Sequence, residues 1–442
     1  MIKSNLVKFL SLFFITIAAQ ILLSMIEGQI EDRSNNRHHA REAIKKSWTG
    51  DQTLLASVLT IPFERAKEIR IFDKELNRYV AKVNWIKDET FILPKLINID
   101  ASLKHQVLSK GIYQVPVYTS TIKLVALFVR DRLIEMAKDP KIRLSKTAFL
   151  SFGVRDTRGI TGSPSIRFDK KELTVLPGTQ LDFFLSGFHS EVSIKNMKEP
   201  LAFDVDMQVK GMGRIAFIAT ARENSVTIQS EWPHPSFDGA FLPISRKISD
   251  QGYTASWKTG IFSTDIENTI EQCFDDHCDD IYASSFGVNH IQAVDIYLKS
   301  LRSIKYGILV LIITFTIFIL YEVLNKRIRI HPVSYSLTGM ALSIFFLLLI
   351  ALSEHINFES AYWISSFSCS GLIAYYVSQL SHSKRHGGIM FGLLNGFYLI
   401  LFFIIRSEDH ALLSGSLLLF ILLAVVMVVT RKVDWYQLAS KN

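Results

Sequence analysis

The apolar residues of this chain gather in two places, at its start and in its last third. One apolar segment covers residues 7–26, about 280 mostly polar residues follow, and five further apolar segments come after them. Each segment is about 17–22 residues long, which at 1.5 Å per helical residue crosses a hydrocarbon core of about 30 Å. The pattern predicts an integral membrane protein with one large domain between its first and second spans.

Six transmembrane α-helices are predicted, one N-terminal and five C-terminal. The first favours an uncleaved anchor over a signal peptide, because its apolar stretch is long and no clear small-residue cleavage site follows it. A polar turn over residues 27–29 and then a charged juxtamembrane helix are expected after it. The predicted spans cover residues 7–26, 306–324, 335–353, 360–380, 389–405 and 411–430.

The short loops between these spans predict an orientation. Loops 325–334 and 382–388 and the tail 431–442 carry Lys and Arg, whereas loop 354–359 has two acids and no Lys or Arg. Because Lys and Arg are retained on the cytoplasmic side, both termini are expected in the cytoplasm. The large domain is then external, and its lack of an Asn-x-Ser/Thr sequon favours the periplasm of a bacterial inner membrane protein.

This layout divides the chain into four parts. They are the anchor 1–26, a periplasmic domain 27–305, a five-helix cluster 306–430 and the cytoplasmic tail 431–442. The membrane protein is therefore of mixed class, with helices in the bilayer and a separate domain outside it.

Within the large domain, strand patterns dominate. Apolar and polar residues alternate over residues 201–210, a period of two that predicts a half-buried strand. A Gly-Met-Gly turn at 211–213 and a return strand over 214–219 are expected next. Pro116 predicts an edge strand, because proline has no N–H to donate to a ladder. We expect a β-rich, sandwich-like domain with little helix.

Charge and composition disfavour two classes of function. The net charge is +8 and the mean hydropathy is +0.23. The basic residues are spread out and no Lys/Arg run is interleaved with aromatics, so nucleic acid is not an expected partner. The middle thirds of the predicted spans contain no Asp, Glu, Lys, Arg or His. Since charges inside a membrane are retained for function, this disfavours a pump or a proton-driven carrier.

Two cysteines form the most chemically suggestive cluster. Cys273 and Cys278 lie in the stretch Cys-Phe-Asp-Asp-His-Cys-Asp-Asp. A disulfide that closes a small acidic loop, two free thiols, and a metal site are all open readings. The tight spacing and the lack of a second Cys/His pair favour the disulfide in an oxidising periplasm. We expect no metal and no cofactor.

An aromatic stretch is the next candidate. Trp232, His234 and Phe237 are interleaved with Pro233 and Pro235. They form either a recognition patch for a partner or a rigid crossing loop, in which the prolines fix the backbone and the aromatics pack inward. We favour the loop. A lone histidine with no partner base or nucleophile is poor support for catalysis.

A charged motif has both a structural and a functional interpretation. Asp156 and Arg158 lie in a charged Arg-Asp-Thr-Arg-Gly stretch. The favoured reading is a turn in which Asp156 caps and Gly159 takes a positive φ, and the alternative is an anion- or partner-binding loop.

Glycines recur every fourth residue in the fifth span. Gly388, Gly392 and Gly396 share one helix face, where small residues let a second helix approach closely. Asn395 is positioned to form a hydrogen bond across the same interface. The favoured role of these glycines is helix packing.

Several further motifs lie in order along the chain. They are Arg155-Asp156-Thr157-Arg158-Gly159-Ile160, Leu176-Pro177-Gly178-Thr179, Ser230-Glu231-Trp232-Pro233-His234-Pro235-Ser236-Phe237, Gly239-Ala240-Phe241-Leu242-Pro243, Gly252-Tyr253-Thr254-Ala255-Ser256-Trp257, Tyr321-Glu322, His331-Pro332, Leu349-Ile350-Ala351-Leu352-Ser353-Glu354-His355 and Val433-Asp434-Trp435-Tyr436. Together they resemble the CreD (Cet) family of bacterial inner membrane proteins. The resemblance covers nearly all of the chain, although it is loosest over residues 64–145 and absent around the two external cysteines.

The resemblance implies a role in envelope homeostasis. It links the family to a sensor-kinase and response-regulator pair, to tolerance of certain colicins and to the β-lactam response, and it supplies no catalytic residue. We therefore expect a non-enzymatic stress-response protein whose partners are the lipid bilayer and envelope or signalling proteins. The alternatives are a transporter or lipid-handling accessory that uses the helix cluster, and a periplasmic enzyme. The sequence does not specify an oligomeric state.

Overall fold

A computed structural model describes residues 2–73, 78–193, 201–273, 279–290, 296–324, 330–406 and 411–431. It divides into two compact units. Residues 40–293 form the β domain, and residues 1–39 with 294–442 form the helical unit. The predicted combination of membrane-type helices and a large β-rich domain is confirmed.

The first helix is longer than the sequence pattern indicated. Helix α1 (Ile2–Ser47) runs without a break for 46 residues, so the polar turn predicted at residues 27–29 is wrong. One glycine in a helix interior costs only about 1 kcal/mol, which the rest of such a long helix tolerates. The last turns of α1 belong to the β domain, where Ile44 clusters with Val115, Val117 and Met212.

Among the described residues, the β domain contains a nine-stranded sheet, here called sheet A. Its order is β14-β17-β12-β1-β6-β10-β9, and β2 and β5 also pair with β1. The strands are β1 (Gln52–Asp73), β2 (Arg78–Ile92), β5 (Ile142–Leu144), β6 (Thr147–Val154), β9 (Val175–Pro177), β10 (Gly187–Ser193), β12 (Arg214–Ile218), β14 (Pro235–Gly239) and β17 (Phe286–His290).

A second sheet, sheet B, has eight strands within the same described ranges, in the order β15-β16-β13-β3-β4-β11-β7-β8. Its strands are β3 (Leu96–Lys110), β4 (Tyr113–Phe128), β7 (Ile160–Phe168), β8 (Lys171–Leu173), β11 (Leu201–Gly211), β13 (Glu223–Ser230), β15 (Ser245–Ser249) and β16 (Gly252–Gly260). Short helices connect some of them: α2 (Asp131–Lys138), the 3-10 turn η1 (Thr157–Gly159), α3 (Ile261–Thr264), α4 (Ile266–Cys273) and α5 (Asp279–Ala283).

One apolar core joins the two sheets. Leu59, Phe152 and Ile215 of sheet A share a buried cluster with Ile99 and Phe203 of sheet B. Burial of such side chains contributes about 1.5–3 kcal/mol each, so this core holds the two sheets together.

The alternation over residues 201–210 is confirmed, since β11 shows the buried and exposed pattern of a strand with one face in the core. The strand predicted over residues 214–219 is present as β12, but its predicted role as the return strand of a hairpin is wrong. β12 does not pair with β11 but lies in sheet A, parallel to β1. The turn at Met212 and Gly213 carries the chain from one sheet to the other, and Gly213 has a φ of +78°, which favours glycine.

The edge-strand prediction at Pro116 holds only locally. β4 is an inner strand of sheet B, between β3 and β11. However, its pairing with β11 stops at Tyr118, so Pro116 pairs only with Val107 of β3. The missing N–H therefore faces the side where the second neighbour has ended.

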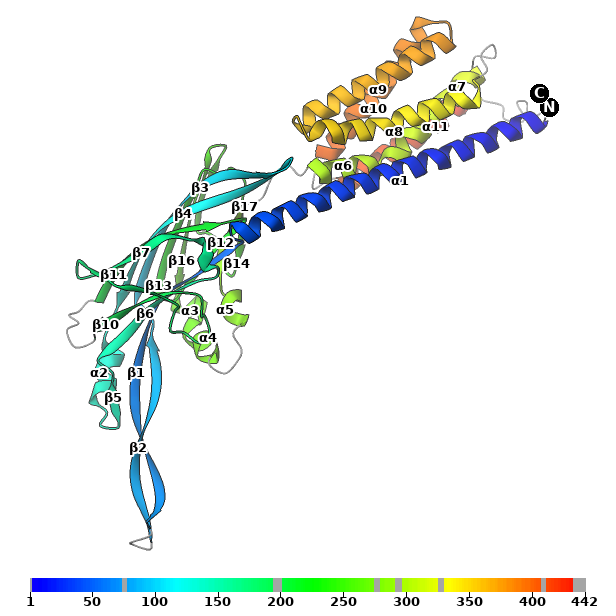
Figure 1. The fold of residues 1–442 in the computed structure, drawn as a ribbon. Helices are drawn as coiled ribbons and strands as arrows, with labels where there is room; N and C mark the ends of the chain where they lie inside the picture. The colour runs from blue at the N-terminus through cyan, green and yellow to red at the C-terminus, as the bar shows by residue number, and fades with distance from the viewer. Residues whose placement is uncertain are drawn as a thin grey trace. The chain divides into compact units, whose positions relative to one another are not determined.

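Strands β1 and β2 form a long two-stranded ribbon, from the pair Leu59 and Ile92 to the pair Asp73 and Arg78. β5 borders only its base, at residues 63–65. Figure 1 shows the ribbon in blue, extending past the other strands of the β domain. We call residues 66–73 with 78–85 the ribbon tip.

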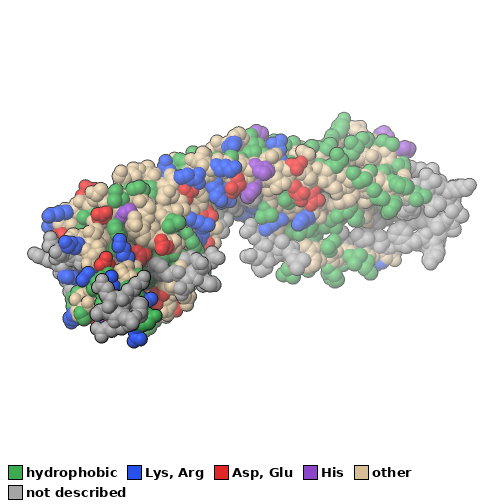
Figure 2. Space-filling view, turned by 60° about the horizontal axis from the view of Figure 1, so that its bottom comes forward, with side chains coloured by type: hydrophobic (Ala, Val, Ile, Leu, Met, Phe, Trp, Pro, Cys, Tyr) green, Lys and Arg blue, Asp and Glu red, His purple; other side chains and the backbone are tan. Residues whose placement is uncertain are grey.

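The helical unit contains the first part of α1 and six further described helices, α6 (Ile296–Lys305), α7 (Gly307–Leu324), α8 (Pro332–Ser353), α9 (Phe358–Leu380), α10 (Lys384–Arg406) and α11 (Ala411–Thr430). Within the described ranges, four helical segments are long and apolar enough to cross a membrane: Leu10–Ser47, Ile296–Ile319, Pro332–Ser353 and Lys384–Arg406. Figure 2 shows hydrophobic side chains gathered over the helices, whereas charged side chains are scattered over the β domain.

The glycine face of α10 does not have the predicted contact. A Cβ added at Gly388, Gly392 or Gly396 would meet no described atom within 4 Å. The close approach between α9 and α10 occurs one residue earlier, at Gly387, where a Cβ would lie 2.6 Å from the carbonyl oxygen of Ala374. Within the described part of the chain, α9 therefore approaches α10 at Gly387, and the packing role of the other three glycines stays a prediction.

Asn395 does form a hydrogen bond between helices, although not across the glycine face where it was predicted. Its Nδ2 donates to Oγ of Ser370 on α9 at 2.8 Å. The partner helix of α10 at this point is therefore α9.

Candidate functional site, a buried histidine–tyrosine cluster

Two histidines meet between the sheets of the β domain. His105 lies on β3 of sheet B and His290 ends β17 of sheet A, and their ring centroids are 4.6 Å apart. Tyr118 of β4 lies 6.1 Å from His105 and 5.6 Å from His290. Tyr253 of β16 lies 6.0 Å from His290. We call these four residues the histidine–tyrosine cluster.

The strand pattern explains why both histidines point inward. Successive side chains of a strand face opposite sides, and the buried face of β3 includes Ile97, Ile99, Ala101 and Leu103, so His105 continues the same phase. His290 follows Phe286 and Val288 in β17 in the same way. Sequence reasoning missed both histidines, although this phase was the signal that could have revealed them.

Hydrogen bonds fix the protonation of His290. Its Nδ1 lies 2.8 Å from the carbonyl oxygen of Gly213, and its Nε2 lies 2.9 Å from the hydroxyl of Tyr253. Because a carbonyl oxygen can only accept, Nδ1 carries the proton and Nε2 accepts from Tyr253. The neutral imidazole thus satisfies both of its nitrogens.

His105 has a different environment. Its Nδ1 lies 3.2 Å from Oγ of Ser230, which also accepts from the backbone N–H of Trp232 at 3.1 Å. The Trp232 ring lies 5.1 Å from the His105 ring. Nε2 of His105 is buried without a hydrogen-bond partner among the described atoms.

Burial disfavours protonation of both imidazoles. It lowers the pKa of His105 to about 3, and the neighbouring His290 adds to this effect. Burial also lowers the pKa of His290 to about 4, although the hydrogen bond to Gly213 opposes this shift. Burial likewise raises the pKa of the Tyr253 hydroxyl. At neutral pH the cluster is therefore uncharged, as a buried group in a low dielectric must be.

This arrangement suits a structural connection between the sheets better than a reaction. A catalytic dyad needs a base that is oriented by a third group, and in the described part of the domain neither imidazole has a carboxylate hydrogen-bond partner. A metal site needs more ligands than two imidazoles, and no group of three His, Cys, Asp or Glu side chains suited to a metal occurs among the described residues.

The aromatic motif lies beside this cluster. Trp232 and Phe237 are partly buried and pack against the main core, and the Phe237 ring is 5.8 Å from that of Tyr253. Pro235 begins β14, opposite His290 in register, while His234 is exposed. These contacts favour the packing interpretation over a recognition patch.

Asp156 and Arg158 form a turn that holds the end of α1. An Asp156 oxygen accepts from the backbone N–H of Arg158 at 3.2 Å, and the two side chains form an ion pair at 2.6 Å. These hydrogen bonds from Arg158 lower the pKa of Asp156. Arg158 also donates to the carbonyl oxygen of Lys46 at 2.8 Å. The geometry favours the turn over an anion-binding loop, since the guanidinium is already engaged.

The predicted role of Gly159 is corrected. Its φ is not positive. Glycine is required there because a Cβ would lie 2.6 Å from the carbonyl oxygen of Lys210, a close backbone approach that only glycine permits.

The cysteine cluster is only partly described. Cys273 is buried at the end of α4. Cys278 lies outside the described residues, so the disulfide stays a prediction.

Comparison with known proteins gives a clear result in sequence and a weak one in structure. A substrate-bound mutant M1 zinc metallopeptidase from Deinococcus radiodurans aligns over 38% of this chain and 39% of its own, at 7% identity and a TM-score of 0.21, a likeness that carries no argument. Residues 4–436 match the family described as Inner membrane protein CreD. The Inner membrane protein CreD of Escherichia coli (strain K12) is 31% identical over 449 residues, which cover 99% of this chain and 95% of that protein. The chain thus belongs to the CreD family of inner membrane proteins.

Proposed function

We propose that this protein is a non-enzymatic component of envelope homeostasis that binds another envelope protein through its ribbon tip. The observation that carries this proposal is the exposure of large apolar side chains there. Ile71 is 41% exposed, Tyr79 70% and Val83 50%. Tyr79 and Val83 lie on one face of the ribbon and Ile71 lies on the other, as the strand register shows. Exposed apolar side chains that gather on one element mark interaction sites.

The physics of the ribbon supports a binding role. An isolated two-stranded ribbon is marginally stable in water, so large apolar side chains that are exposed on it need a reason to persist. The first pair of the ribbon tip is held to the rest of the domain, because the Arg143 guanidinium lies 3.6 Å from the centroid of the Trp85 ring and the N–H of Ala66 donates to the carbonyl oxygen of Lys141. A fixed base and a projecting apolar tip suit a docking element.

The proposal extends to the cellular role. The family resemblance supports a function linked to a two-component regulatory system, to colicin tolerance and to the β-lactam response. A protein that binds partners rather than substrates agrees with the lack of a base–acid pair in the histidine–tyrosine cluster. Non-enzymatic action is part of the proposal.

The membrane topology is also proposed. Six spans with both termini in the cytoplasm would place the β domain in the periplasm. Described helices overlap all six predicted spans, and the loop charges support the orientation. A reporter enzyme that folds only in the periplasm should be active when inserted at Asp250 and inactive when joined to the C-terminus. The opposite pattern contradicts this topology.

Crosslinking in living cells tests the binding proposal. A photoreactive amino acid placed at Tyr79 or at Val83 is expected to capture the same discrete envelope protein. The matched control is Val125 of β4, which is 40% exposed but lies outside the ribbon. No discrete product from the tip, or the same product from Val125, contradicts the proposal.

A charge substitution links the contact to function. The double variant Tyr79→Asp and Val83→Asp should leave folding intact, because both side chains are exposed. In a deletion strain it is expected to restore envelope permeability and β-lactam response no better than an empty vector. Full restoration by this variant would contradict ribbon binding.

A further inference from the structure

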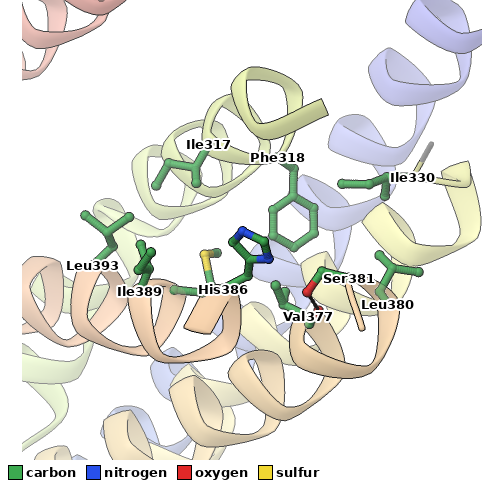
Figure 3. A pocket seen from close by; sticks show the side chains of 10 residues that line it. Ile317, Phe318, Ile330, Val377, Leu380, Ser381, His386, Ile389 and Leu393 are labelled. Atoms are coloured by element: carbon green, nitrogen blue, oxygen red, sulfur yellow. Dashed lines mark hydrogen bonds between the residues drawn. The ribbon is translucent and has the colours of Figure 1, made fainter. Parts of the chain in front are cut away.

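An apolar cavity of about 200 Å³ lies between α7, α9 and α10 of the helical unit. Figure 3 shows its walls, which include Phe318 from α7, Val377 and Leu380 from α9, and Leu393 from α10. Cavities of about 150 Å³ with such linings stay dry and take up small hydrocarbons. The cavity therefore prefers hydrocarbon to water.

Two polar side chains, His386 and Ser381, also line the cavity. Figure 3 shows the His386 ring among the lining residues, next to the Phe318 ring. Lys384 and Arg385 come directly before His386, and both are exposed. Two cations and an imidazole thus begin α10. His386 lines the cavity, whereas Lys384 lines a separate hollow on another face of α10, with Gly387 and Gly388.

The length of α10 places this end at a membrane surface. The helix has 23 residues, which at 1.5 Å per residue is about 34 Å, close to the roughly 30 Å of the hydrocarbon core. Its first turn therefore lies at the level of the lipid headgroups, where Lys and Arg attract anionic lipids. The positive-inside rule explains the side on which the cations lie, but not the apolar hollow next to them.

Two side chains of the cavity wall are also exposed on the outside of the helical unit. Ile389 is 51% exposed and Leu393 49% exposed, whereas Met390 between them is 3% exposed. A hydrocarbon chain can enter sideways past Ile389 and Leu393 without crossing a polar layer.

We propose that this cavity binds one acyl chain of an anionic phospholipid, whose phosphate pairs with Lys384 and Arg385. The cations outnumber the acid on the neighbouring helix, Glu322, which follows Phe318 by one turn. The site is separate from the ribbon tip and does not depend on it.

Retention of lipid by the full-length protein tests the proposal. The protein is purified in detergent with equal amounts of dioleoyl phosphatidylglycerol and dioleoyl phosphatidylcholine, and bound lipid is counted by native mass spectrometry. We expect an approximately tenfold preference for phosphatidylglycerol, because each cation near the headgroup adds to the attraction. The double variant Lys384→Gln and Arg385→Gln should lose this preference. Arg406→Gln, at the other end of α10, is the control and should keep it.

A second measurement reports on the acyl chain. Val377→Phe should fill the cavity and abolish retention of both lipids. If that variant does not fold, a phosphatidylglycerol with a photoreactive acyl chain is used with the unmodified protein, and labelling at Met390 over Leu399, an exposed residue of α10, supports the proposal. The proposal is overturned if the unmodified protein retains the two lipids equally, or if the variant without the two cations keeps the preference. It is also overturned if a folded Val377→Phe protein still retains lipid, or if Met390 and Leu399 are labelled equally.

Discussion

Lowering the pH from 7.5 to 5 is expected to destabilise the β domain through its histidine–tyrosine cluster. Burial holds the pKa of His290 near 4 and that of His105 near 3 in the folded protein, whereas an unfolded histidine has a pKa of about 6.5. The unfolded chain therefore takes up protons below about pH 6.5 while the folded domain does not. Stability from these groups is fully present above pH 6.5 and is lost as the pH falls toward 4.

The loss per histidine is the same for His290 and His105, because both folded pKa values lie below 5 and both unfolded values lie near 6.5. At pH 5 the unfolded imidazole lies about 1.5 pH units below its pKa, which corresponds to about 2 kcal/mol. Total stabilities are only about 5–15 kcal/mol, so the effect is large. Hydrogen exchange of the β17 amides in the full-length protein measures the local free energy of opening at each pH.

Variants distinguish the contribution of the histidine–tyrosine cluster to the pH dependence from the effect of acid on the rest of the domain. His290→Met should cost about 1–3 kcal/mol at pH 7.5, because the Tyr253 hydroxyl loses its acceptor and the Gly213 carbonyl loses one of its two donors, keeping only the backbone N–H of residue 290. The same variant should show a shallower dependence on pH. His234→Gln, in an exposed loop nearby, serves as the control and should match the unmodified protein. A β17 free energy that is constant from pH 7.5 to 5 would refute the prediction.

The cluster also shows how far the sequence could be interpreted. The alternation in β11 correctly predicted a strand and its buried face, because every second residue there is apolar. It did not predict that β12 would join the other sheet. The choice of neighbour depends on contacts between segments far apart in the chain, such as β12 beside β1, and periodicity carries no information about them.

The site residues were missed for a related reason. His105 and His290 are separated by most of the β domain in sequence, and each looks unremarkable beside its own neighbours. The strand alternation predicts that both side chains point inward, but it does not predict that they contact each other between the two sheets. By contrast, the local turn at Asp156 was predicted correctly, since a cap depends on residues only two positions apart. Local hydrogen bonding was accessible from the sequence, and long-range pairing was not.

The second large effect is expected at Gly387 of α10, which faces α9. Replacing Gly387 with Ala is expected to destabilise the helical unit, because the new Cβ would lie 2.6 Å from the Ala374 carbonyl oxygen and 2.8 Å from the Ser378 Cβ. Backbone of α9 cannot move away as a flexible side chain could. Overpacking of this kind costs about 1–3 kcal/mol, and it should also loosen the hydrogen bond from Asn395 to Ser370 across the same pair of helices.

The neighbouring glycines provide the matched comparison. Gly388→Ala and Gly392→Ala add the same methyl group to the same helix, one and five residues further on, where it would meet no described atom within 4 Å. Neither variant should lower the thermal unfolding temperature of the detergent-solubilised protein, and the better helix propensity of alanine should raise it slightly. A Gly387→Ala protein as stable as these two would show that α9 and α10 do not approach as closely as described. If Gly392→Ala alone were destabilised, the open glycine face would have to be in contact with atoms outside the described part of this chain, because no described atom lies close enough to resist the added methyl group.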